Sequence, residues 1–149
     1  MGDRKFNKQR TIAWNLAVLC ASLGGCSDKR AVKTVPVEGI VRLESGAWPA
    51  AGNISFVPTE AASGYPLRPG WAEFNQQGEF AAGCFEDGDG LVPGKYVVNI
   101  DCWDTVNQGA KKKPAASCIP AKYQRGFQEL VVAADADEPI TVEWVIPTK

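Results

Sequence analysis

The sequence contains no histidine, a single methionine and no Cys-x-x-Cys pair among its five cysteines. Without histidine, Ser-His-Asp and Cys-His catalysis and all histidine-containing zinc sites are excluded. Without closely spaced cysteines, a four-thiolate metal site is not expected either. The chain also has no run of about 20 apolar residues, the length that a membrane-spanning helix needs. We therefore expect this chain of 149 residues to be no enzyme and to hold no cofactor.

The first 25 residues have the organisation of an export signal. Four of the first ten residues are basic and one is acidic, and residues 11–25 carry no charge. A basic segment followed by an apolar segment and small residues is typical of a secretory signal peptide. A retained transmembrane helix is the alternative, but the uncharged segment is short for one. We expect residues 1–25 to be a cleaved signal peptide.

The end of this segment, Leu23-Gly24-Gly25-Cys26, resembles the lipobox of bacterial lipoproteins, in which the cysteine receives diacylglycerol. The resemblance implies lipidation of Cys26, with residues 26–34 as a tether. Each buried methylene of an acyl chain adds about 0.8 kcal/mol, so more than one chain holds a protein at a bilayer. We thus expect an exported, membrane-anchored lipoprotein, periplasmic or on the outer surface. The alternative is an ordinary secretory signal, with Cys26 left as a thiol.

The chain that would follow cleavage is mildly acidic. Without residues 1–25 it has 12 basic and 16 acidic side chains, a net charge of −4. Nucleic-acid binding requires a concentrated positive field. The one basic cluster, Lys111-Lys112-Lys113, lies in a segment with Pro, Ala and Gly and is interpreted as a solvated loop. We expect no nucleic-acid partner.

Residues 35–149 show short alternating apolar segments separated by Gly, Pro, Asn and Asp, which is typical of strands and turns. Helical periodicity is not found. The predicted strands are 37–44, 52–58, 71–75, 78–85, 95–103, 130–132 and 140–146. Seven short strands in roughly 110 residues favour an all-β domain, a seven-stranded Greek-key β-sandwich of the prealbumin (transthyretin-like) or immunoglobulin-like kind.

Alternation within these strands also predicts burial. Trp103 falls on the face opposite to the buried side chains of its strand, so it is expected to be exposed. Pro58 lacks a backbone N–H and predicts a strand end or an edge strand. The predicted core residues are Phe74, Phe80, Tyr96, Val98, Ile100, Cys102 and Trp144.

Several motifs follow one another in the order of a known family. They are Val37-Glu38-Gly39-Ile40-Val41, Asn53-Ile54-Ser55-Phe56-Val57-Pro58, Gly78-Glu79-Phe80, Pro93-Gly94-Lys95-Tyr96 and Pro120-Ala121-Lys122-Tyr123. Together they resemble the carboxypeptidase regulatory-like, transthyretin-like β-sandwich domains of small lipoproteins from planctomycete-type bacteria. The resemblance implies a prealbumin-like sandwich, an envelope location and no assigned activity. Two features depart from the pattern: Gln76-Gln77 stands in the turn where the family has an aspartate, and there are extra cysteines.

Three cysteines follow Cys26, and exported cysteines tend to be oxidised. A bridge between Cys102 and Cys118 would close a loop of residues 103–117. Such a loop stabilises a domain by about 3 kcal/mol in the chain-entropy model. A bridge between Cys84 and Cys102 is one alternative, and the absence of any bridge is another.

Two other groups of residues are candidates for ligand binding. Glu86, Asp87 and Asp89 place three carboxylates in one turn, which suits calcium, although the distal glutamate of an EF-hand is missing and a solvated turn is favoured. A second acidic turn at residues 135–138 has the same interpretation. Exposed indoles stack on sugars, and the four tryptophans after the signal segment are Trp48, Trp71, Trp103 and Trp144.

Three functional hypotheses follow. The first is a non-enzymatic lipid-anchored envelope protein that acts as a structural or protein-interaction module. The alternative is a carbohydrate- or calcium-binding β-sandwich module. The third is carboxylate-only chemistry such as glycoside cleavage, which needs no histidine.

Overall fold

The computed structural model describes residues 32–104 and 116–147. The chain divides between Arg30 and Ala31, and every described residue belongs to the second unit. The expected signal peptide, the lipidation site Cys26 and the basic cluster at residues 111–113 lie outside the described residues. The structure therefore does not test these predictions.

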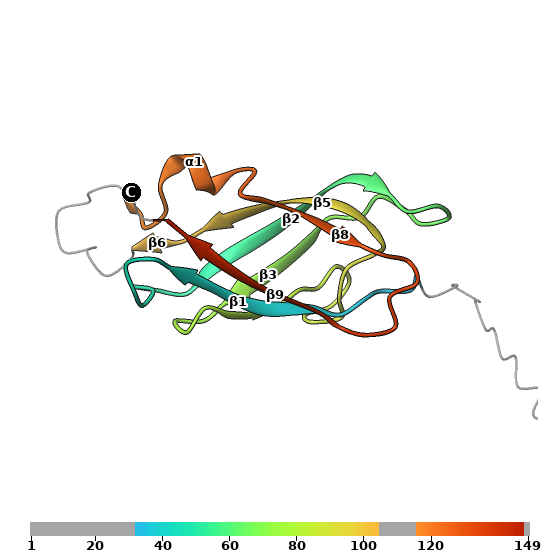
Figure 1. Ribbon diagram of the computed structural model, residues 1–149, viewed down its shortest axis with the longest axis horizontal. Coiled ribbons are helices and arrows are strands. Elements are labelled where there is room, and N and C mark those ends of the chain that lie inside the picture. Colours follow the sequence, from blue (N-terminus) through green and yellow to red (C-terminus); the bar gives the residue numbers. More distant parts are fainter. Residues whose placement is uncertain (1–31, 105–115, 148–149) are drawn as a thin grey trace, which may run out of the picture. The chain divides into compact units, whose positions relative to one another are not determined.

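Seven strands form one mixed sheet that curls around its core and is nearly barrel-shaped (Figure 1). The order across the sheet is β8-β5-β2-β3-β4-β1-β9. All-β folding and the expected seven strands are confirmed. The strands are β1 (Val37–Leu43), β2 (Gly52–Ala61), β3 (Gly70–Phe74), β4 (Glu79–Ala81), β5 (Gly94–Asp101), β8 (Gln128–Val132) and β9 (Ile140–Ile146).

The two strands nearest the ends of the domain, β1 and β9, lie side by side and run parallel. Their register extends from Val37 opposite Ile140 to Leu43 opposite Ile146. A Cβ added at Gly39 would collide with the carbonyl oxygen of Val142. Glycine therefore permits the close approach of β9, which forms the edge of the sheet beside β1. All the other pairings of the seven strands are antiparallel.

β2 lies between β5 and β3 and continues to Ala61, which corrects the prediction that Pro58 marks a strand end or an edge strand. Pro58 lies opposite Tyr96, inside β2, and a bulge follows it before Glu60. The pairing of β2 with β3 ends earlier, at Phe56 opposite Gly70. On that side the proline needs no partner, so the missing N–H leaves no ladder bond unmade.

The core is filled from alternate positions of the strands, as the sequence predicts. Among the described residues no polar or charged side chain is buried. Trp144 of β9 lies at the centre of an aromatic cluster, with ring centroids 5.5 Å from Phe80, 6.5 Å from Phe56 and 6.2 Å from Phe127. The predicted core residues are all buried: Phe74, Phe80, Tyr96, Val98, Ile100, Cys102 and Trp144.

Three local features differ from the prediction. The strand expected at 95–103 is interrupted at Cys102, and β6 (Trp103–Asp104) instead pairs with β7 (Ala116–Ser117). A single helical turn, α1 (Ala121–Gln124), follows. One turn is too short to show helical periodicity in a sequence. None of the described helices is long and apolar enough to cross a membrane.

Candidate functional site

The four tryptophans divide into two buried and two exposed side chains. Trp48 and Trp144 are in the core, and the Nε1–H of Trp48 donates to the carbonyl oxygen of Val41 at 2.7 Å. Trp71 is 42% exposed and Trp103 is 47% exposed. Of the four tryptophans in the described residues, Trp71 and Trp103 are therefore the two whose rings are accessible to a ligand, and the expected exposure of Trp103 is confirmed.

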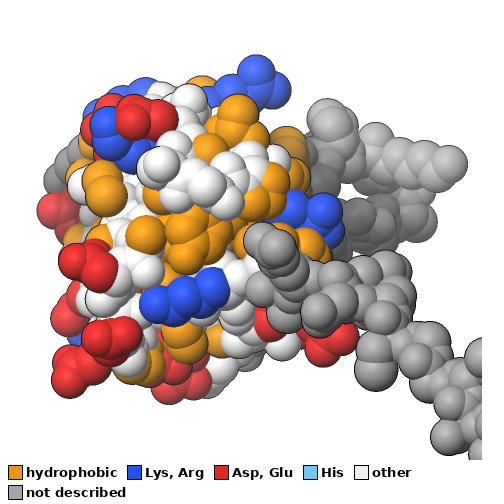
Figure 2. Space-filling view, turned by 90° about the vertical axis from the view of Figure 1, so that its right-hand side faces the viewer, with side chains coloured by type: hydrophobic (Ala, Val, Ile, Leu, Met, Phe, Trp, Pro, Cys, Tyr) orange, Lys and Arg blue, Asp and Glu red, His pale blue; other side chains and the backbone are white. Residues whose placement is uncertain are grey.

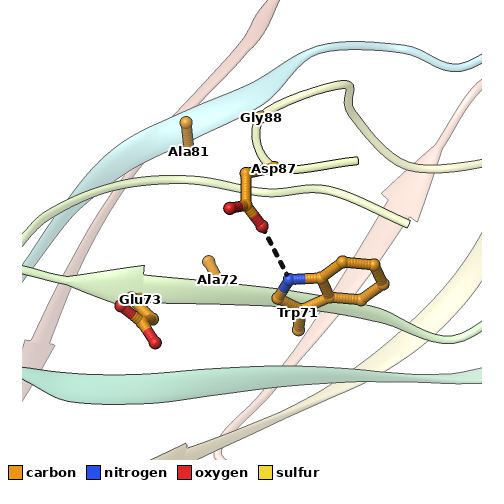
Figure 3. A pocket seen from close by; sticks show the side chains of 6 residues that line it. All are labelled: Trp71, Ala72, Glu73, Ala81, Asp87 and Gly88. Carbon is orange, nitrogen blue, oxygen red and sulfur yellow. Dashed lines mark hydrogen bonds between the residues drawn. The ribbon is translucent and has the colours of Figure 1, made fainter. Parts of the chain in front are cut away.

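Trp71 borders a cleft of about 410 Å³ where β3 and β4 separate (Figure 3). The two strands pair at Phe74 opposite Phe80 and meet again at a bridge between Trp71 and Gly83. Between these two contacts the ladder has no registered pair in the described chain. The cleft is lined by Trp71, Ala72, Glu73, Ala81, Asp87 and Gly88.

The polar groups of the cleft come from β3 and from the turn after β4. Asp87 extends over β3, and its Oδ1 accepts a hydrogen bond from the indole Nε1–H of Trp71 at 3.2 Å (Figure 3). Gly88 follows Asp87 and has a φ of 74°, a left-handed conformation that favours glycine. The chain reverses direction at this residue. Glu73 lies two residues from Trp71, so both side chains are on the same outer face of β3. An orientated indole thus lies beside two carboxylates.

The turn that holds Asp87 is organised by Asp89. The Oδ1 of Asp89 accepts the backbone N–H of Cys84 at 2.8 Å, and its carboxylate also faces the N–H of Phe85. Arg68 donates from Nε to the Cys84 carbonyl oxygen at 3.1 Å, and its guanidinium lies 4.3 Å from the centre of the Phe85 ring. The hydrogen bonds of Asp89 and Arg68 to the backbone therefore stabilise this turn.

The calcium prediction concerned the same turn. Asp87 and Asp89 are directed to different partners, the indole of Trp71 and the backbone at Cys84. Within residues 32–104 and 116–147, no three His, Cys, Asp or Glu side chains come together as a group able to hold a metal ion. The structure does not bring Glu86 into such a group with Asp87 and Asp89, and the same holds for the acidic turn at 135–138.

Trp103 borders a second depression, of about 370 Å³, on the outer face of β2 and β5. The Oδ1 of Asn99 accepts the backbone N–H of Gly126 at 2.8 Å, which ties the segment after α1 to this face. The depression is lined by Ser55, Asn99, Asp101, Trp103, Gln124 and Arg125. It differs from the cleft at Trp71 because it includes a basic side chain.

The three cysteines of the domain occupy different environments. Cys84 is fully buried, and its pKa is raised by burial and by the nearby Asp89 carboxylate. The Sγ–H of Cys102 faces the carbonyl oxygen of Ala50 at 3.7 Å. Cys118 is partly buried and packs against the core. The structure records all three side chains as thiols.

The surface that lies on the right in Figure 1 is mixed in character. Hydrophobic side chains gather in its middle, acidic side chains lie mainly toward its margin, and basic side chains are scattered (Figure 2). A nucleic-acid-binding face would concentrate the basic side chains. On this face the basic side chains are not concentrated in one patch.

Sequence reasoning missed the cleft at Trp71. It identified Asp87 as a member of an acidic turn and Trp71 as one of four tryptophans, but the pairing of the two depends on how β3 and β4 separate. Glu73 and Arg68 gave no signal as isolated charges. Comparison of the chain with protein-family models, curated proteins and solved structures gave no match.

Proposed function

We propose that this chain is an exported lipoprotein, anchored through diacylglycerol on Cys26, whose domain is a non-enzymatic interaction module of the cell envelope. The basic and apolar halves of residues 1–25 and the lipobox-like Leu23-Gly24-Gly25-Cys26 support the anchor. The first strand begins at Val37, so a short tether separates it from the lipid. The absence of histidine from the whole chain argues against most catalytic mechanisms.

A prealbumin-like sandwich, as the family resemblance implies, is the finer fold that we propose. The strands β3 and β4 share a single registered pair, Phe74 opposite Phe80, and the bridge between Trp71 and Gly83 lies beyond the end of β4, so the ladder of the sheet is shortest there. This divides it into β8-β5-β2-β3 and β4-β1-β9. Phe56 of the first group lies 6.4 Å from Phe80 and 6.5 Å from Trp144 of the second group. Two groups of strands that contact each other through a shared core are what a sandwich requires.

The observation that carries an interaction role is the exposure of apolar side chains on the two edge strands. The edges of the sheet are β8 and β9. Val131 on β8 is 61% exposed and Val145 on β9 is 54% exposed. Edge strands present unpaired backbone groups, and another protein adds a strand there by backbone hydrogen bonding. These edges are the proposed contact surfaces.

Mass spectrometry of the protein from its native membrane tests the anchor. The expected result is a mature chain that begins at Cys26 and carries diacylglycerol. A Cys26→Ser variant, expressed beside it, should be released from the membrane fraction, whereas a Cys118→Ser variant should remain bound. A wild-type chain that starts at another residue without lipid contradicts the proposal.

Glycan binding is the second candidate function, and the cleft at Trp71 favours it. The apolar face of a pyranose ring stacks on an indole. Carboxylate oxygens such as those of Glu73 and Asp87 accept hydrogen bonds from sugar hydroxyl groups. The hydrogen bond from Trp71 to Asp87 fixes the indole before a ligand arrives, which reduces the entropic cost of binding.

A glycan array followed by titration of the best ligand tests this candidate. Trp71→Ala should weaken binding about tenfold or more, because stacking and an orientated contact are both lost. Trp103→Ala is the matched control, since both indoles are similarly exposed, and it should bind as the wild type does. Unchanged binding by Trp71→Ala contradicts the cleft, and loss in Trp103→Ala instead points to the depression at β5.

Two further measurements separate the remaining hypotheses. If calcium binds the acidic turn, the melting temperature should rise with the logarithm of the calcium concentration once binding saturates, and Asp87→Asn should remove that effect. A melting temperature that calcium leaves unchanged argues against the calcium alternative. Release of reducing sugar from a bound glycan, lost in Glu73→Gln, would instead show that the two carboxylates of the cleft act as a glycosidase.

A further inference from the structure

Two cysteines lie opposite each other at the base of the β6–β7 ribbon. Trp103 is opposite Ser117 in the antiparallel register, so the next position pairs Cys102 with Cys118. The backbone N–H of Cys118 donates to the carbonyl oxygen of Cys102 at 2.9 Å. Opposite residues in a hydrogen-bonded antiparallel pair have Cα atoms about 5.5 Å apart. That separation is within the range that disulfides span.

The two side chains also lie on the same side of the ribbon. Opposite residues of a β-ladder direct their side chains to one face, and adjacent residues alternate. Cys102 is 1% exposed and Cys118 is partly buried against the core, whereas Trp103, the residue after Cys102, is exposed. Both sulfur atoms are therefore on the core side, where a bond between them needs no change in the direction of either strand.

We propose that Cys102 and Cys118 are joined by a disulfide in the exported protein. The thiolate of Cys118, the more accessible of the two, attacks the disulfide of an exported thiol–disulfide donor and forms a mixed disulfide. The thiolate of Cys102 then displaces the donor. The donor gains two electrons and leaves as a dithiol, and the two cysteines become one disulfide. The weak contact of the Cys102 Sγ–H with Ala50 O, at 3.7 Å, is given up in the process.

Cys84 is not the partner, although the sequence left that alternative open. Its surroundings include Val92, Asp89 and the Tyr96 hydroxyl, which places it toward the start of β5. Cys102 directly follows the last residue of the same strand. Cys102 lies six positions after Tyr96, which is about 20 Å along a strand. Burial and Asp89 also raise the Cys84 pKa, so less thiolate is available for exchange.

The bridge would fix the chain on both sides of the loop 103–117. Cys102 directly follows β5, and Cys118 leads into Ile119, which is buried, and then into α1. Linking them restricts the unfolded chain, and reduction should lower the melting temperature by roughly 10 °C or more. The disulfide is expected to hold the Trp103 side of the domain together outside the cell.

Peptide mapping of the full-length protein, purified after export, tests this inference. The protein is denatured in an alkylating reagent without reductant and then cut at the lysines between the two cysteines. The expected result is a linked pair of peptides containing Cys102 and Cys118, lighter by two hydrogens than the free peptides together, and an alkylated Cys84. A link through Cys84, or three alkylated cysteines, overturns the inference.

Variants separate the disulfide from general effects on folding. Cys84→Ser should keep both the link and the reductant-sensitive melting temperature. Cys102→Ser/Cys118→Ser should melt with or without reductant at the temperature of the reduced wild type. A wild-type protein that carries the link but melts at the same temperature with and without reductant contradicts the stabilising role.

The inference rests on the proposed export, because export supplies the oxidising compartment. Its chemistry is tested independently in a buffer of oxidised and reduced glutathione. The full-length reduced protein should form the same link there, with Cys84 remaining a thiol. If the link forms in this buffer but the cellular protein is neither exported nor lipidated, the proposed function fails and the pairing stands. If no link forms in the buffer, the pairing itself fails.

Discussion

Two tryptophans support the fold and two are available at the surface, although all four belong to the same sheet domain. Trp144 lies within a cluster of three phenylalanine rings, and Trp48 is fixed by a hydrogen bond to Val41. Trp71 and Trp103 stand on outer faces, each beside a depression. For Trp71, Trp103 and Trp144 the difference follows from which face the strand position uses, whereas Trp48 lies in the loop between β1 and β2 and folds back onto Val41. Side chains of one chemical type thus divide into structural and candidate binding residues, and each prediction below tests this division.

Replacing Trp144 by alanine is expected to have the largest effect. The change removes contacts with rings in β2, β4 and the segment before β8, and a fully buried large aromatic costs about 3–5 kcal/mol when truncated. Equilibrium unfolding in urea measures the loss. Val145→Ala changes the next residue, which is 54% exposed, and should cost under about 0.5 kcal/mol. If the two variants were equally stable, the core position of Trp144 would be wrong.

The burial pattern behind this prediction is readable from the sequence. Alternation predicts β1 and β9 with bounds within a residue of those observed, because each strand has one apolar and one polar face. It does not predict that these two strands are parallel neighbours, since that pairing joins residues about 100 positions apart. Local patterns carry no information about which distant strand lies alongside.

The candidate sites are harder to predict from the sequence, because they too depend on contacts between separate segments. The predicted strand 78–85 ends at Ala81, because Asp89 draws the backbone at Cys84 into a turn. That turn brings Asp87 to Trp71, a contact that depends on a side-chain hydrogen bond between separate segments. By contrast, the register of β6 with β7 places Cys102 opposite Cys118, the two cysteines of one of the bridges that the sequence left open. Short-range loops are accessible to sequence reasoning, and clefts between strands are not.

A pH titration extends the comparison to a buried tyrosine, Tyr96. Burial, and secondarily Cys84, raise the pKa of the Tyr96 hydroxyl to about 12, and the hydroxyl donates to Val92 O at 2.5 Å. The unfolded chain releases this proton near pH 10, so the unfolded state is favoured as the pH rises from 10 to 12. The free energy of unfolding should fall by about 2 kcal/mol over this interval.

Chemical denaturation at several alkaline pH values measures this fall. Tyr96→Phe should remove it, whereas Tyr65→Phe, which changes a tyrosine only partly buried against the core, should leave it in place. The raised pKa of Cys84 acts in the same direction, so Cys84→Ser is measured beside both. A fall of full size in Tyr96→Phe would assign the effect to other groups.

A smaller effect is expected for Trp48→Phe. The phenylalanine keeps an aromatic ring near Phe74, whose centroid lies 4.6 Å from that of Trp48. It removes the indole N–H, so the buried carbonyl of Val41 loses a donor, at a cost of about 1–2 kcal/mol. Urea unfolding checks the value. A loss as large as that of Trp144→Ala would show that ring volume, and not the hydrogen bond, is what Trp48 contributes.

The smallest effects on stability are expected at the exposed indoles. Trp71→Phe loses one exposed hydrogen bond to Asp87, and Trp103→Phe loses part of a surface contact, so each should change the free energy of unfolding by under about 0.5 kcal/mol. Asp87→Ala is measured beside Trp71→Phe and should match it, because both remove the same bond. A loss of 2 kcal/mol or more in Trp71→Phe would make Trp71 a structural residue, and its exposure would then need no ligand to explain it. If the stability of Trp71→Phe is unchanged and Trp71→Ala no longer binds a glycan, Trp71 is a binding residue and not a structural one.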